Sequence, residues 1–229
     1  MYRTFLNARS PLRLLEKGLH GGLGPGNLGL VLAGHGVGKT GFLVCVALDE
    51  LLRSGHVLHV ALDQTVSHVR AFYDTVFEEL AATTHLEDEA LVHAEIDRRR
   101  SIRVYPPDTL TVARLRDAVK VETEAAAKPS LLILEGLDLE NLPRDQMVEL
   151  AALARELAAE VWLSAACSGE RVEQLPDFAQ RVEDLVSVIL VLEPGPGAVA
   201  LRALKDHDSP DPSALHVALD PRTLLLTRS

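Results

Sequence analysis

Short apolar runs alternate with longer segments of helical periodicity along most of the chain. The run from Leu28 to Ala33 is bounded by turn residues on both sides and predicts a buried strand. Residues 41–52 then repeat apolar side chains at helical spacing and stop at Ser54-Gly55, a helix-end signal. Similar runs predict strands at 56–62, 102–105, 131–134 and 161–166, and similar periodicity predicts helical structure from about 66 to 100, 111 to 127 and 145 to 160. This alternation is typical of an α/β fold with a mostly parallel twisted sheet flanked by helices.

The C-terminal part has a different pattern. Four apolar runs occur there, at 186–192, 198–204, 215–219 and 224–227. Pro-Gly-Pro-Gly separates the first two runs, and Asp220-Pro221-Arg222 separates the last two, so we expect two antiparallel hairpins. Because no repeat, low-complexity tract or long linker interrupts the pattern, residues 1–229 are expected to form a single domain.

A glycine-rich loop at residues 33–40 is the strongest chemical signal. Its sequence, Ala-Gly-His-Gly-Val-Gly-Lys-Thr, fits a phosphate-binding loop with alanine in place of the first glycine, between a predicted strand and a predicted helix. Glycines let backbone N–H groups close around a phosphate, Lys39 can reach its oxygens, and the Thr40 hydroxyl can bind Mg²⁺. We therefore expect ATP or ADP with Mg²⁺ to be bound by Gly34, His35, Gly36, Val37, Gly38, Lys39, Thr40 and Gly41. The alternative is a glycine-rich turn with a solvated lysine.

A second signal is an acidic residue that ends an apolar strand. Glu135 follows the run 131–134, and ligands of open α/β sheets bind at the carboxyl ends of strands. We expect Glu135 to hold Mg²⁺ together with Thr40, in the position of a Walker B acid. That acid is normally aspartate, and Glu135 is one methylene longer. The alternative is a surface or capping carboxylate.

With the glycine-rich segment 18–26 ahead of the loop and Gly136-Leu137-Asp138 after Glu135, these motifs resemble the RecA-like P-loop ATPases. The layout is most similar to the KaiC family, whose members carry a GGL-x-x-G stretch ahead of the loop. The resemblance covers most of residues 15–207. It implies a RecA-like fold and hydrolysis of ATP in a site completed by a neighbouring subunit.

The resemblance also implies a residue that orients the attacking water. Asp63 ends the strand 56–62 and resembles the family's acid in this role, which is usually glutamate; Gln64 is a neighbouring candidate. Asp63 could equally cap the helix that we expect to begin near Val66. Because Asp63 and Glu135 each differ from the usual residue by a methylene, and a ~1 Å misplacement can cost on the order of 10²-fold, we expect slow hydrolysis with Lys39, Asp63 and Glu135 as catalytic residues.

Family members extend a Lys-x-Arg pair from the C-terminal hairpin into the ATP site of the next subunit. Lys205 matches the lysine of this pair, and His207 replaces the arginine. Since an arginine finger can be worth about 10³–10⁵ in rate, a weaker, pH-dependent cation at position 207 also favours slow turnover. The alternative is a solvated polar turn.

Composition narrows the partners. The chain is 47% hydrophobic and 24% charged, like an ordinary folded protein, and its formal net charge of −10 opposes contact with nucleic acid. No apolar run approaches the ~20 residues of a membrane span, and the N-terminus lacks the apolar stretch of a signal peptide, so a cytoplasmic location is expected.

Cys45 and Cys167 are expected to be small buried residues of a reducing compartment. His56 and His59 should point to opposite faces of one strand, which argues against a shared metal site.

Two functions of different class fit the sequence, and a third is less favoured. The first is a slow Mg²⁺-dependent ATPase whose nucleotide state controls contacts in a homo-oligomer or with a protein partner. The second is a regulatory scaffold that binds nucleotide without useful turnover. A recombinase-like DNA-binding ATPase is opposed by the net charge and by the short, aromatic-poor segments where DNA-contacting loops would fall.

Overall fold

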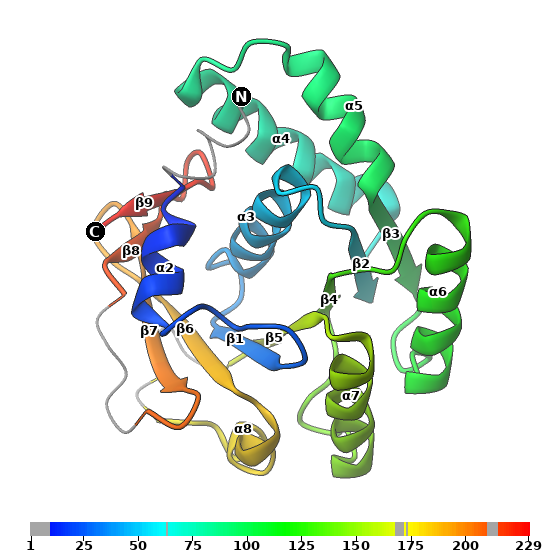
Figure 1. Cartoon of the computed structure of the whole chain (residues 1–229). Coiled ribbons are helices and arrows are strands. Elements are labelled where there is room, and N and C mark those ends of the chain that lie inside the picture. The colour runs from blue at the N-terminus through cyan, green and yellow to red at the C-terminus, as the bar shows by residue number, and fades with distance from the viewer. Residues whose placement is uncertain (1–9, 63, 168–171, 173, 210–214) are drawn as a thin grey trace.

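A computed structural model describes residues 10–62, 64–167, 172, 174–209 and 215–229 of the chain. Within these residues the chain forms a nine-stranded sheet of order β3-β2-β4-β5-β1-β6-β7-β8-β9 (Figure 1). Neighbouring strands from β3 through β6 are parallel, and those from β6 through β9 are antiparallel. The structure therefore confirms a mostly parallel sheet with C-terminal antiparallel hairpins. The parallel strands are β1 (Leu28–Ala33), β2 (Val57–Leu62), β3 (Arg100–Tyr105), β4 (Leu131–Glu135), β5 (Glu160–Ala166) and β6 (Val188–Pro194). The strands that complete the sheet are β7 (Val199–Asp206), β8 (Val217–Leu219) and β9 (Leu226–Arg228).

Helices cover both faces of this sheet. On one face lie α2 (Leu12–Gly18), α3 (Lys39–Leu52), α4 (Val66–Thr84) and α5 (Glu89–Arg99), and on the other lie α6 (Val112–Ala125), α7 (Arg144–Leu157) and the short α8 (Asp177–Gln180) (Figure 1). Alternate residues of each strand contribute to the two cores: Ile133 packs with the α3 side and Leu132 with the α6 and α7 side. Two covered faces explain why the central strands are continuous apolar runs in the sequence.

Three local details of the helices were not predicted. The helical stretch from about 66 to 100 is two helices, because His85 adopts a left-handed conformation (φ 52°) that ends α4, and Asp88 (φ 58°) precedes α5. The N-cap of α6 is Thr111, whose hydroxyl accepts a hydrogen bond from the Arg114 amide. Helix α2 was not predicted.

No helix in the described part of the chain is long and apolar enough to cross a membrane. Cys45 and Cys167 are both buried and free.

Candidate functional site

The carboxyl ends of four neighbouring parallel strands, β2, β4, β5 and β1, meet at one edge of the sheet and border a cavity of about 500 Å³. The glycine loop after β1 contributes His35 and Lys39, and the chain after β4 contributes residues 135–140. The end of β5 contributes residues 164–166, and Leu62, Gln64 and Phe178 complete the described lining. The sequence signals at 34–40 and at 135 thus lie beside one cavity.

The glycine loop requires glycine at two of its positions. Gly36 has φ 72° and Gly38 has φ 119°, conformations that L side chains rarely adopt. Gly38 is also the N-cap of α3, and a Cβ there would lie 2.7 Å from Cδ2 of Leu219 in β8. The C-terminal hairpin therefore packs closely against this loop, and the positive end of the α3 dipole lies where the loop ends.

Lys39 folds back over the loop. Its Nζ donates hydrogen bonds to the carbonyl oxygens of Ala33, at 3.2 Å, and of Gly34, at 2.9 Å. Burial lowers the pKa of Lys39, and the nearby Cys167 and Glu135 act in the opposite direction. A partly buried ammonium group held by two neutral carbonyls is well suited to exchange these contacts for an anion.

Glu135 and Thr40 lie in direct contact although they are 95 positions apart in sequence. The Thr40 hydroxyl, in the first turn of α3, donates a hydrogen bond to Oε1 of Glu135, at the end of β4. Glu135 is buried, with 6% of its surface exposed. The two residues expected to hold a metal ion are therefore brought together by the fold.

His59, in β2, contacts the second oxygen of Glu135 and was not predicted as a site residue. Its Nε2 lies 3.3 Å from Oε2 of Glu135, and its Nδ1 lies 3.1 Å from the hydroxyl of Tyr73 in α4. The prediction that His56 and His59 point to opposite faces of one strand is not tested, because His56 lies outside β2, which begins at Val57. The signal available in the sequence was a histidine inside an otherwise apolar strand.

Asp63, the predicted water-orienting acid, lies outside the described residues. The alternative role in capping α4 belongs to Thr65, whose hydroxyl accepts a hydrogen bond from the His68 amide at 3.1 Å. Gln64 lines the cavity, and its buried Oε1 has no hydrogen-bond partner among the described residues. An unpartnered acceptor beside the cavity can receive a hydrogen bond from a ligand or water.

Lys205 and His207 lie far from the cavity of their own chain. They are at the end of β7, where Asp206 pairs with Val188 and Val188 pairs with Gly29 near the start of β1. The Lys205 ammonium donates a hydrogen bond to the Glu183 carbonyl at 2.5 Å. The Nε2 of His207 donates to the Leu23 carbonyl at 3.1 Å, and its Nδ1 lies 2.9 Å from the fully buried Asp206.

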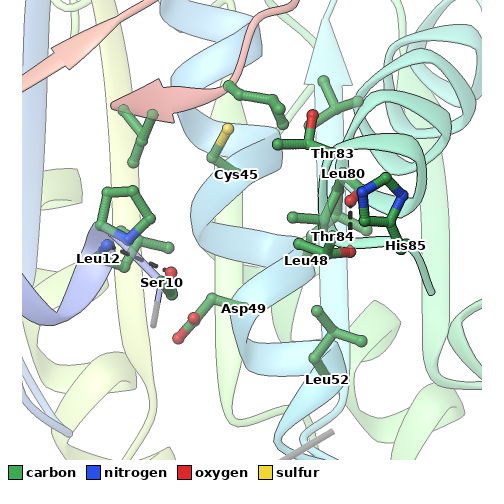
Figure 2. A pocket seen from close by; sticks show the side chains of 14 residues that line it. Ser10, Leu12, Cys45, Leu48, Asp49, Leu52, Leu80, Thr83, Thr84 and His85 are labelled. Carbon is green, nitrogen blue, oxygen red and sulfur yellow. Dashed lines mark hydrogen bonds between the residues drawn. The ribbon is translucent and has the colours of Figure 1, made fainter. Parts of the chain in front are cut away.

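A second cavity, of about 570 Å³, lies between the start of α2, α3, the end of α4 and β9 (Figure 2). Its lining is mostly apolar, and its described part contains no lysine or arginine. Burial raises the pKa of the Cys45 thiol in this lining to about 12, which makes it a poor nucleophile. Asp49 is already ion-paired with Arg13 and Arg53. The cavity at the strand ends is therefore the better candidate for polar chemistry.

The donor groups at the strand ends fit a nucleotide-bound Mg²⁺ better than a metal held by protein alone. In the described part of the chain, no group of three or more His, Cys, Asp or Glu side chains could hold a metal ion. Mg²⁺ commonly takes one or two protein ligands and completes its shell with phosphate oxygens and water. Thr40 and Glu135 provide such a pair of oxygen ligands beside a loop with free space at Gly36. Neither a protein-family model nor a curated protein matches the chain. Any function inferred for this cavity therefore depends on the geometry of its residues.

Proposed function

We propose that the protein binds ATP and ADP with Mg²⁺ and hydrolyses ATP slowly, as a P-loop ATPase of the RecA-like type most similar to the KaiC family. One observation carries the proposal. The lysine and threonine of a glycine loop and an acid 95 positions further along the chain lie together at the carboxyl edge of a parallel sheet. The strand order supports it as well, because β5 lies between the loop strand β1 and the acidic strand β4, and its end lines the cavity that both border.

Each group at the cavity has a role in this proposal. The left-handed glycines of the loop and the N-terminus of α3 receive the phosphates, and Lys39 exchanges its carbonyl contacts for phosphate oxygens. Thr40 and Glu135 would hold Mg²⁺, which when bound supplies charge neutralisation on the phosphates. Burial lowers the pKa of Lys39, and a bound phosphate would favour its charged form.

We propose that the residue orienting the attacking water is Gln64 or Asp63, which follow β2. Gln64 has a buried, unpartnered Oε1 beside the cavity among the described residues, and Asp63 precedes it in the sequence. An amide oxygen can accept a hydrogen bond from water but is a weak base, so it orients the nucleophile without removing its proton. This supports slow turnover rather than the complete loss of turnover expected of a regulatory scaffold.

The proposal is tested by Lys39→Ala, with Lys120→Ala on the exposed side of α6 as the matched control. Hydrogen bonds to charged groups contribute about 1.5–3 kcal/mol, so Lys39→Ala should weaken Mg·ADP binding by roughly 10- to 100-fold, measured by calorimetry. Wild-type phosphate release should be slower than about 1 s⁻¹, the low end of ordinary turnover. Unchanged affinity in Lys39→Ala would contradict nucleotide binding at this loop, and an absence of any phosphate release would favour the non-hydrolysing scaffold.

A further inference from the structure

His59 is a polar side chain in an apolar strand, and it is completely buried. A buried polar group is costly unless it is hydrogen-bonded, so both of its ring nitrogens need partners. Its Nε2 lies 3.3 Å from Glu135 Oε2 and its Nδ1 lies 3.1 Å from the Tyr73 hydroxyl. Both nitrogens are therefore satisfied, and one of them is satisfied by the candidate metal ligand.

Hydrogen-bond chemistry gives this contact a direction. An ionised carboxylate only accepts hydrogen bonds, so Nε2 carries a hydrogen and donates it to Glu135. Nδ1 of the neutral ring then accepts from the Tyr73 hydroxyl, while Thr40 donates to the other carboxylate oxygen. Glu135 is thus held by one donor at each of its two oxygens.

The far end of this chain of contacts is also fixed. Tyr73 is 1% exposed, and the guanidinium of Arg100 lies 4.5 Å from the centre of its ring. Arg100 in turn forms an ion pair with Asp97 in α5. Tyr73 of α4, His59 of β2 and Glu135 of β4 are therefore joined by consecutive hydrogen bonds.

The Glu135 side chain needs contacts that fix the orientation of its carboxylate. It has one more rotatable bond than the aspartate usual in this role, so an unsupported Glu135 could place its carboxylate in several ways. We propose that His59 is a positioning residue that fixes the Glu135 carboxylate with Oε1 toward Thr40, in the orientation that binds nucleotide-associated Mg²⁺. This inference rests on the proposed function and assigns a role that the glycine loop and Glu135 alone do not provide.

The test uses the full chain and compares His59→Leu with His59→Gln, whose side-chain amide nitrogen can still donate to Glu135. The affinity for ADP is measured by calorimetry without metal and across a range of Mg²⁺ concentrations. Loss of a residue that orients a metal ligand typically costs roughly 10–100-fold in metal affinity, so His59→Leu should weaken apparent Mg²⁺ affinity by that factor. It should leave metal-free ADP affinity unchanged, and His59→Gln should recover most of the loss.

A second variant keeps the test valid if the buried histidine cannot be replaced. Tyr73→Phe keeps the ring under Arg100 but removes the hydroxyl that holds Nδ1, and it should weaken apparent Mg²⁺ affinity several-fold. A wild-type Mg²⁺ dependence in His59→Leu, or in Tyr73→Phe if the His59 variants do not fold, would overturn the inference. Such a result in a protein that still needs Lys39 for binding would leave the proposed function intact, whereas a wild type that binds no ADP would remove both.

Discussion

Glu135 and Glu160 are acids at opposite ends of the neighbouring parallel strands β4 and β5, and their surroundings differ. Glu135 receives hydrogen bonds from Thr40 and His59 at the candidate site. Glu160 receives one from the Gly24 amide at 3.1 Å, but burial and the nearby Glu50 both raise its pKa. Hydrogen-bond donors thus stabilise the Glu135 carboxylate, whereas the ionised form of Glu160 lowers the stability of the folded protein.

We expect Glu160→Gln to stabilise the protein at pH 7. The folded-state pKa of Glu160 is raised, so its stabilising contribution is present below the unfolded-state pKa of about 4.3 and is lost as the pH rises through the folded-state value. Glutamine removes the charge and keeps an oxygen that can accept from Gly24. The free energy of unfolding, measured with urea at pH 7 and near pH 4, should exceed that of wild type only at pH 7. Glu149→Gln, at an exposed position of α7, serves as the control, and an equal gain at both pH values would contradict the argument.

At the scale of elements, the sequence predicts the positions of most strands but not their order in the sheet. Largely apolar runs mark β1, β2, β4 and β5 because helices cover both faces of the sheet. The end of α4 and the start of α5 depend on left-handed residues that are not glycine, His85 and Asp88, which no simple sequence signal indicates.

The residues of the candidate site likewise include some that the sequence predicts and some that it does not. The glycine loop and Glu135 could be recognised because their chemistry is local to short segments. The contact between His59 and Glu135 could not, because β4 pairs with β2 and not with β3, its predecessor in the chain. That pairing places the two side chains on one sheet face, and nothing in the local sequence specifies it.

The start of α4 offers a test of how local structure supports the site. Thr65 caps this helix, which carries Tyr73, and Thr65 is the residue after Gln64. Thr65→Ala should destabilise the protein by about 0.5–2 kcal/mol, and Thr65→Ser, which keeps the hydroxyl acceptor, should stay within about 0.5 kcal/mol of wild type. Urea denaturation measures both. Equal stability of the two variants would show that the Thr65 hydroxyl does not contribute as a cap.

At the scale of the whole molecule, the cavity and Lys205 lie at opposite ends of the strands of the sheet. The cavity lies at the carboxyl ends of β1 and β4, whereas Lys205 lies near the end of β7, which pairs with the start of β6. The Lys205 ammonium donates a hydrogen bond there to the Glu183 carbonyl. A contact between Lys205 and the cavity therefore requires a second copy of the chain, with the two edges facing each other.

Such a contact joins two different surfaces, so it is head-to-tail and closes into a ring or continues as a filament. If nucleotide is bound between copies, linkage requires that Mg·ATP stabilise the assembly, and the mass measured by light scattering should rise when Mg·ATP is added. Lys205→Ala should reduce that rise, because it removes a cation from the shared site, while Lys128→Ala, an exposed lysine after α6, should not. The nucleotide affinity of the isolated chain should be the same in both variants, since Lys205 does not reach its own cavity. A protein that remains monomeric at high concentration with Mg²⁺ and a saturating, non-hydrolysable ATP analogue would exclude a site shared between copies, and Lys205 would then be an ordinary surface residue of the hairpin.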